Sequence, residues 1–144
     1  MKSYHDTSFL FSLYVQQAHS TKAAAHMKGA KTALPLTSLG RFELFNAIRL
    51  AVFRKALGVR EAHADMAAIE MDLAEGVLAV TPCDWAAVHA VAERLSAEHT
   101  LGSGCRGMDV LHVATALTLG ATEFLTFDVS QAVLARAEGV NVNP

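Results

Sequence analysis

The sequence is poor in cysteine, which excludes small proteins that are stabilised by disulfide bonds or by zinc bound to cysteine. Of its 144 residues only Cys83 and Cys105 are cysteines. Two cysteines are too few for a disulfide scaffold or for a zinc site built on cysteine ligands. We expect both to be free thiols in a reducing cytoplasm.

The chain also lacks a strong charge bias and a long apolar run. Twelve lysines and arginines stand against fourteen aspartates and glutamates, so the formal net charge is −2. That balance excludes a strongly basic protein that wraps nucleic acid. The longest apolar candidate, Val110 to Ala121, is interrupted by His112 and falls short of the roughly 18 to 20 residues of a membrane helix. The acidic Asp6 precedes any apolar stretch, so we predict no signal peptide and a cytoplasmic location.

The composition favours one folded domain. Hydrophobic residues make up 52% of the chain and charged residues 18%. This is enough apolar material for a core, and the length suits a single domain over residues 1–144.

Short apolar segments alternate with longer segments of helical periodicity. Alternation of this kind is typical of parallel strands joined by helices, so we predict an α/β fold with three layers, α/β/α, and a parallel sheet of about five strands. The run at 77–80 is continuously apolar, which favours a strand buried on both faces. The strands are expected at 2–5, 32–36, 77–80, 123–127 and 140–142. Helices are expected at 39–57, 60–75, 85–99, 108–119 and 130–138, with Ser38 and Asp84 as caps of the first and third and Gly76 at the end of the second.

Four carboxylates occupy positions unlike those of the surface acids. Asp6 ends the first expected strand and Asp128 ends the fourth, whereas Glu43 and Asp109 lie near the starts of helices that follow the second strand and a glycine-rich segment. Ligands of parallel sheets bind beyond the carboxyl ends of the strands, and all four acids are expected at that edge. Their mutual repulsion calls for a cation.

An acidic site without paired histidine or cysteine favours a hard cation. Mg²⁺ and Mn²⁺ prefer oxygen ligands, whereas zinc prefers nitrogen and sulfur. Such an ion polarises a phosphate and activates water, so hydrolysis of phosphodiesters is the reaction class that the residues favour.

Several blocks of the sequence resemble a known family. They are HDTS at 5–8, RFELFN at 41–46, MDVLHVATAL at 108–117, and the segment from Gly120 that ends in FLTFD at 124–128. Together they resemble the PIN-domain ribonucleases, in particular the VapC-type toxins of bacterial toxin–antitoxin modules. The resemblance extends over nearly the whole chain.

The resemblance implies a Mg²⁺-dependent (or Mn²⁺-dependent) endoribonuclease that cuts structured RNA such as tRNA or rRNA. It also implies a homodimer and a cognate antitoxin that silences the toxin. Asp6, Glu43 and Asp109 match the three core acidic positions of the family, Asp128 matches the fourth, more variable acid, and Thr126 matches the hydroxyl residue that accompanies it. His5 departs from the pattern, since the family more often has an apolar residue there.

Each of these residues also has a purely structural interpretation. Asp6 and Asp128 can cap helices, and Glu43 and Asp109 can be first-turn acids that complement a helix dipole. His112, one turn after Asp109, is expected to be a hydrogen-bonded core histidine.

Other functions and surfaces remain open at the level of sequence. The same acids suit a phosphatase or a DNA nuclease, and a degenerate PIN fold that only binds RNA or protein is a further alternative. The helices that begin at Leu39 and Arg60 are candidates for a homodimer face or an antitoxin groove. A set of basic residues is a candidate for RNA phosphate contacts or for ordinary solvated helix faces: Arg41, Arg49, Arg54, Lys55, Arg60 and Arg106.

Overall fold

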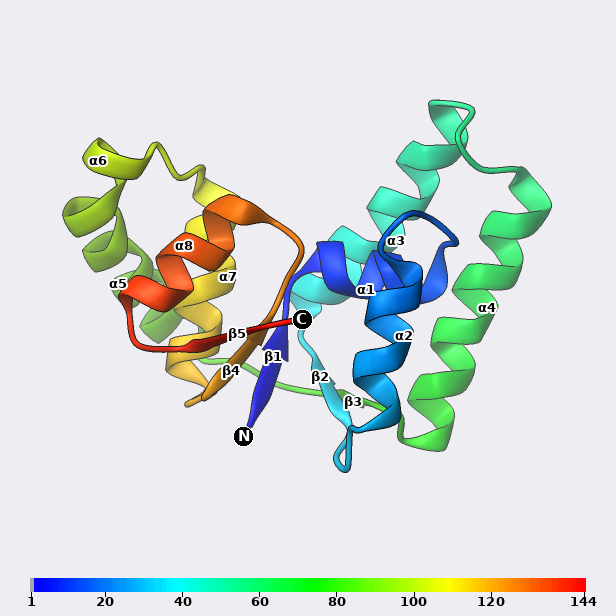
Figure 1. The fold of residues 1–144 in the computed structure, drawn as a ribbon, viewed down its shortest axis with the longest axis horizontal. Coiled ribbons are helices and arrows are strands. Elements are labelled where there is room, and N and C mark those ends of the chain that lie inside the picture. The colour runs from blue at the N-terminus through cyan, green and yellow to red at the C-terminus, as the bar shows by residue number, and fades with distance from the viewer. Residues whose placement is uncertain (1) are drawn as a thin grey trace. The chain divides into compact units, whose positions relative to one another are not determined.

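The computed structural model describes residues 2–144 as an α/β chain whose paired strands all run parallel (Figure 1). The strands form two sets: β1 (Ser3–His5), β4 (Glu123–Leu125) and β5 (Asn141–Asn143), with β4 in the middle, and β2 (Leu34–Leu36) with β3 (Leu78–Val80). The predicted α/β class and parallel pairing are confirmed. The expected single sheet of about five strands is wrong, because the hydrogen-bonded ladders stop after three and two strands.

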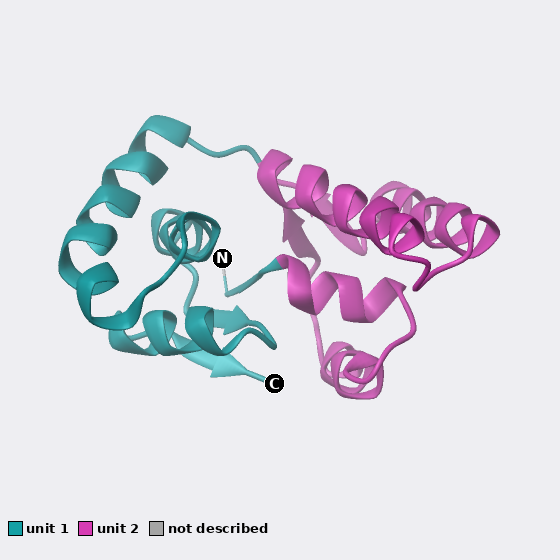
Figure 2. Cartoon of the chain, turned by 90° about the horizontal axis from the view of Figure 1, so that it is seen from above, with its two compact units in different colours: residues 1–6, 82–144 teal, residues 7–81 magenta. Residues whose placement is uncertain are grey.

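The chain divides into two compact units (Figure 2). Unit 1 combines residues 1–6 with residues 82–144, and unit 2 is the continuous segment 7–81. The three-stranded set therefore belongs to unit 1 and the two-stranded set to unit 2. Within residues 2–144, no helix is both long enough and apolar enough to cross a bilayer. The single nuclease domain over residues 1–144 stays a prediction.

Helices supply most of unit 1. Asp84 begins the first of them as predicted, because its carboxylate accepts a hydrogen bond from the Ala87 amide at 3.1 Å. The expected helix over 85–99 changes to a π-helical turn before its end. The elements are α5 (Trp85–Leu95), the π-turn η1 (Ser96–Thr100), the short α6 (Leu101–Ser103), α7 (Gly107–Thr118) and α8 (Val129–Ala137).

The core of unit 1 is formed by side chains of the three-stranded sheet and of α5, α7 and α8. Tyr4 and Phe124 are partners in the parallel register of β1 and β4, and both are buried with ring centroids 5.6 Å apart. The Tyr4 hydroxyl makes a 2.8 Å hydrogen bond with His112 Nδ1 on α7. This confirms the predicted core role of His112, since a buried imidazole needs such a partner.

Unit 2 is built from α1 (Thr7–Tyr14), α2 (Ser20–Lys28), α3 (Ser38–Phe53) and α4 (Val59–Glu75) around the β2–β3 pair.

The ends of α3 and α4 follow local backbone chemistry. The side chain of Thr37, one residue before the expected cap at Ser38, accepts a hydrogen bond from the Gly40 amide at 3.0 Å. The end of α3 comes before the expected Leu57, because Lys55 takes a left-handed conformation with φ of 60°. Gly76, with φ of 79°, ends α4 as predicted, since glycine adopts this conformation without a Cβ penalty.

The prediction that the third strand is buried on both faces is wrong. Leu78 is buried, but the Val80 side chain is 79% exposed. Within unit 2, β3 pairs with β2 alone, so β3 is an edge strand there. A continuous apolar run does not by itself show how many neighbours a strand has.

The core of unit 1 predicts the effect of removing one ring. Phe124→Ala empties a fully buried site in the middle strand, so we expect the free energy of unfolding to fall by about 3 to 5 kcal/mol. The measurement is urea unfolding at equilibrium. Leu101→Ala is the control, because Leu101 on α6 is fully exposed and truncation there should stay within about 0.5 kcal/mol. Equal losses in the two variants would contradict this assignment of the core.

Candidate functional site

Asp6 lies where two neighbouring strands of unit 1 end. It directly follows β1, and its backbone amide donates to the Leu125 carbonyl at 3.1 Å. The Thr126 hydroxyl, just after β4, donates to Asp6 Oδ2 at 2.8 Å. Both side chains are buried. Asp6 is therefore held at the carboxyl edge of the sheet, as the sequence predicted.

Asp128 is joined to the same hydroxyl. Its backbone amide donates to Thr126 Oγ1 at 2.9 Å, so this one hydroxyl contacts both Asp6 and Asp128. Asp128 is also the N-cap of α8, because its Oδ1 accepts from the Gln131 amide at 2.9 Å. The capping role considered from the sequence is thus real, and it uses one of the two carboxylate oxygens.

Asp109 is buried in the first turn of α7. Its Oδ2 accepts from the Arg106 backbone amide at 3.1 Å and from the Arg106 guanidinium Nε at 3.5 Å. Its Oδ1 accepts from Gln131 Nε2 at 3.1 Å. The helix N-terminus also stabilises a negative charge here.

A continuous chain of hydrogen bonds thus links three of the predicted acids. It runs from Asp6 through Thr126 to Asp128, and on through Gln131 to Asp109. These residues are far apart in the sequence and all belong to unit 1. Sequence reasoning missed Gln131; its position three residues after a capping aspartate is the signal that could have found it.

The donors of this group suit a divalent cation. The Asp109 carboxylate is buried, yet its ion pair is with an arginine whose side chain is 80% exposed, which compensates a buried charge only weakly. The group offers carboxylate oxygens and the Gln131 carbonyl oxygen, with no nitrogen or sulfur ligand among the linked side chains. This is the oxygen-rich set that Mg²⁺ and Mn²⁺ prefer.

Glu43 is located in unit 2, on α3. It is half-buried and accepts a hydrogen bond from the hydroxyl of Thr7, the residue that follows Asp6 in the chain. Its membership in the acidic set stays a prediction.

A second group of possible metal ligands involves α5, η1 and α8. The ligand atoms of Glu98, His99 and Glu138 all lie within 4.8 Å of one another. Among residues 2–144, no three of the predicted acids form such a group. Arg94 donates to Glu98 at 2.9 Å and to Glu138 at 2.6 Å. The Arg94 guanidinium, and after it His99, lowers the pKa of Glu138 below its usual range. This group is an ion-pair network that the sequence did not indicate.

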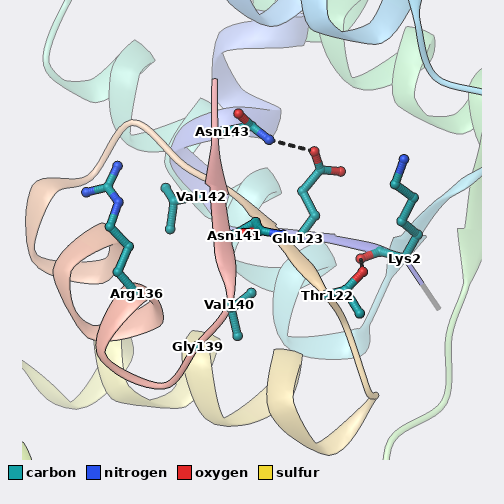
Figure 3. Close-up of a pocket in the computed structure, with 9 residues that line it drawn as sticks. All are labelled: Lys2, Thr122, Glu123, Arg136, Gly139, Val140, Asn141, Val142 and Asn143. Atoms are coloured by element: carbon teal, nitrogen blue, oxygen red, sulfur yellow. Dashed lines mark hydrogen bonds between the residues drawn. The ribbon is translucent and has the colours of Figure 1, made fainter.

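Unit 1 also contains an open cavity of about 600 Å³ (Figure 3). Lys2, Thr122 and Val140, which line it, precede β1, β4 and β5, so much of the lining is at the amino-terminal side of the strands. Asn143 donates to Glu123 at 2.8 Å in its wall. None of the predicted site residues lines this cavity.

No family model and no curated protein sequence matches the chain. Several solved structures do. VapC20 from Mycobacterium tuberculosis, described as a toxin that cleaves the sarcin-ricin loop, has a TM-score of 0.68 at 20% identity, covering 99% of this chain and 100% of that chain. FitAcB from Neisseria gonorrhoeae gives 0.64 at 16% identity, covering 99% and 96%. VapBC-1 from nontypeable Haemophilus influenzae gives 0.63 at 18% identity, covering 99% and 97%.

The chain has the PIN fold. The resemblance predicted from the acidic blocks is therefore confirmed at the level of the fold. In this PIN fold, Asp6 and Asp128 follow parallel strands and Asp109 begins a helix, as the sequence predicted.

The shared hydroxyl predicts a specific cost. Thr126→Val keeps the shape of the side chain but removes both hydrogen bonds. We therefore expect the free energy of unfolding to fall by about 1 to 3 kcal/mol. Thr126→Ser keeps the hydroxyl and should lose about 1 kcal/mol for one buried methyl. Urea unfolding measures both. A valine variant no less stable than the serine variant would show that the hydroxyl does not hold Asp6.

Proposed function

We propose that this PIN-fold chain is a metal-dependent endoribonuclease and the toxin of a toxin–antitoxin pair. Its substrate would be structured RNA such as tRNA or rRNA. The observation that carries the proposal is the hydrogen-bonded chain joining Asp6, Asp128 and Asp109 at the strand ends of unit 1. The shared fold with a toxin described as cleaving the sarcin-ricin loop supports the same class of activity.

Asp6, Asp109 and Asp128 would hold Mg²⁺ or Mn²⁺, and Glu43 is proposed as the fourth acid. When bound, the cation polarises the phosphate and makes water a stronger nucleophile. The chain's own residues set the geometry. Thr126 orients Asp6, and the α7 N-terminus with the Arg106 amide orients Asp109.

Arg106 is a candidate for binding the RNA backbone. Its backbone amide and Nε contact Asp109, while most of its side chain is exposed to solvent. A guanidinium beside the acids can contact a phosphate next to the scissile bond without reading a base. Such a contact contributes affinity that falls as salt rises.

The nuclease proposal is tested by RNA cleavage. Labelled tRNA and rRNA are incubated with the purified chain in Mg²⁺, Mn²⁺ or EDTA. Cleavage should need the metal and should fall by on the order of 100-fold in Asp109→Asn and Asp128→Asn, because each loses a charge that holds the ion. Glu43→Gln tests the fourth acid in the same assay. Asparagine caps helices as well as aspartate does, so the Asp128 variant should keep its fold.

Asp84→Asn is the matched control for this assay. Asp84 caps α5 as Asp128 caps α8, so the control makes the same change in the same structural role outside the acidic group. Cleavage retained in Asp128→Asn would contradict the proposal. An absence of Mn²⁺ binding by calorimetry would favour the degenerate binding module, and cleavage of DNA or release of phosphate instead of RNA cleavage would favour the other enzymes.

Exposed rings on α3 support a partner surface. Phe42 is 70% exposed, and Phe53 lies eleven residues further along, about three turns, so both rings fall on one face of the helix. Val59 and Met71 on α4 are exposed as well. We propose that this apolar surface of unit 2 binds a partner helix, either from a second copy of the chain or from the antitoxin.

Sedimentation of the purified chain tests the homodimer. If the face joins two copies, Phe53→Ser should weaken dimerisation by about 30-fold, the effect of removing an aromatic hot spot of about 2 kcal/mol. Val129→Ser is the control, because Val129 is equally exposed but lies on α8 of unit 1. A monomeric wild-type chain would remove the homodimer and leave the antitoxin as the partner proposed for this face.

A further inference from the structure

One buried oxygen in the acidic group takes no part in the hydrogen-bond chain. Gln131 is only 7% exposed. Of the buried side-chain nitrogens and oxygens in the described part of the chain, its Oε1 is the atom without a hydrogen-bond partner. An unsatisfied buried acceptor costs about 1 to 3 kcal/mol, so the position calls for an explanation.

Two acids determine how the Gln131 amide is turned. An ionised carboxylate only accepts hydrogen bonds, so Asp109 Oδ1 requires the amide nitrogen to face it, at 3.1 Å. The Gln131 backbone amide meanwhile donates to Asp128 Oδ1. Gln131 is thus fixed between Asp109 and Asp128, and its carbonyl oxygen is the remaining free group.

The free oxygen needs a donor that the acids themselves do not supply. The side chains of Asp109 and Asp128 act as acceptors in the chain, and an apolar side chain of similar size would avoid the cost of burying the oxygen. Water that accompanies a divalent cation is a donor that the acidic group would bring in, because Mg²⁺ keeps several of its waters in protein sites.

We propose that Gln131 is a positioning residue of the acidic site, whose Oε1 accepts a hydrogen bond from water carried in by the divalent cation. The inference rests on the metal site of the proposed function. It adds a residue outside the predicted set of acids. It also explains why an amide is placed here: the nitrogen serves Asp109 and the oxygen serves the water.

Manganese titration by calorimetry, without RNA, tests the proposal. Gln131→Met keeps the length of the side chain and removes the oxygen, and we expect its affinity for Mn²⁺ to be about 10- to 100-fold weaker than that of the wild type. Gln131→Glu keeps an acceptor oxygen, loses the donor to Asp109 and adds a negative charge that attracts the cation. It should therefore bind Mn²⁺ at least as tightly as the wild type.

A second measurement uses the wild-type chain and so does not depend on how the variants fold. The side-chain carbonyl carbon of Gln131 is followed by NMR during titration with Mg²⁺, with Gln16 and Gln17 as controls. Gaining a hydrogen bond should move the Gln131 signal downfield and leave the controls in place. A purely structural Gln131 would change stability in the variants but would move neither the Mn²⁺ affinity nor this signal.

The outcomes separate the two proposals. A wild-type chain that binds no Mn²⁺ removes the metal site and this inference together. If the wild type binds Mn²⁺, the Gln131 inference alone is overturned when Gln131→Met binds within about threefold of it, when Gln131→Glu is as weak as the Met variant, or when the carbonyl signal stays in place.

Discussion

The shared hydroxyl of Thr126 is the interaction on which the arrangement of the site depends. It donates to the Asp6 carboxylate and accepts from the Asp128 backbone, so it joins the end of β1 to the start of α8. This geometry is available because β1 and β4 are parallel neighbours, which brings residues after both strands to one edge of the sheet. The acids of unit 1 are thus positioned by sheet pairing first and by side-chain hydrogen bonds second.

The sequence predicted the α/β class and most helix ends, because these depend on local periodicity, caps and left-handed glycines such as Gly76. It failed where pairing between distant segments decides the outcome. The run ending at Val80 has the composition of a buried strand, yet β3 has one paired neighbour, and the five strands form two ladders. Composition shows that a strand is apolar; it does not show which strands pair with it.

The residues of the site also fall into those that the sequence predicted and those that it missed. Asp6, Asp109 and Asp128 were predicted from strand ends and a helix start, since these positions are visible in a single sequence. Gln131 was missed, because its position three residues after Asp128 indicates a capping contact at most and does not indicate the contact with Asp109. The role of Gln131 depends on its hydrogen bond to Asp109, which is 22 positions away in the sequence. The ion-pair network around Glu138 was missed for the same reason.

Unit 1 is made from the two ends of the chain, with unit 2 inserted between them. Asp6 and Thr126 are 120 positions apart, so the loop that joins them closes late and at an entropic cost. A growing polypeptide can complete unit 2 while β4, β5 and the partners of Asp6 are still to be synthesised. A chain that stops after unit 2 therefore contains Asp6 and Glu43 without Asp109 and Asp128. The hydrogen-bonded chain that links Asp6 to Asp109 forms only after β4 and α8 have been synthesised.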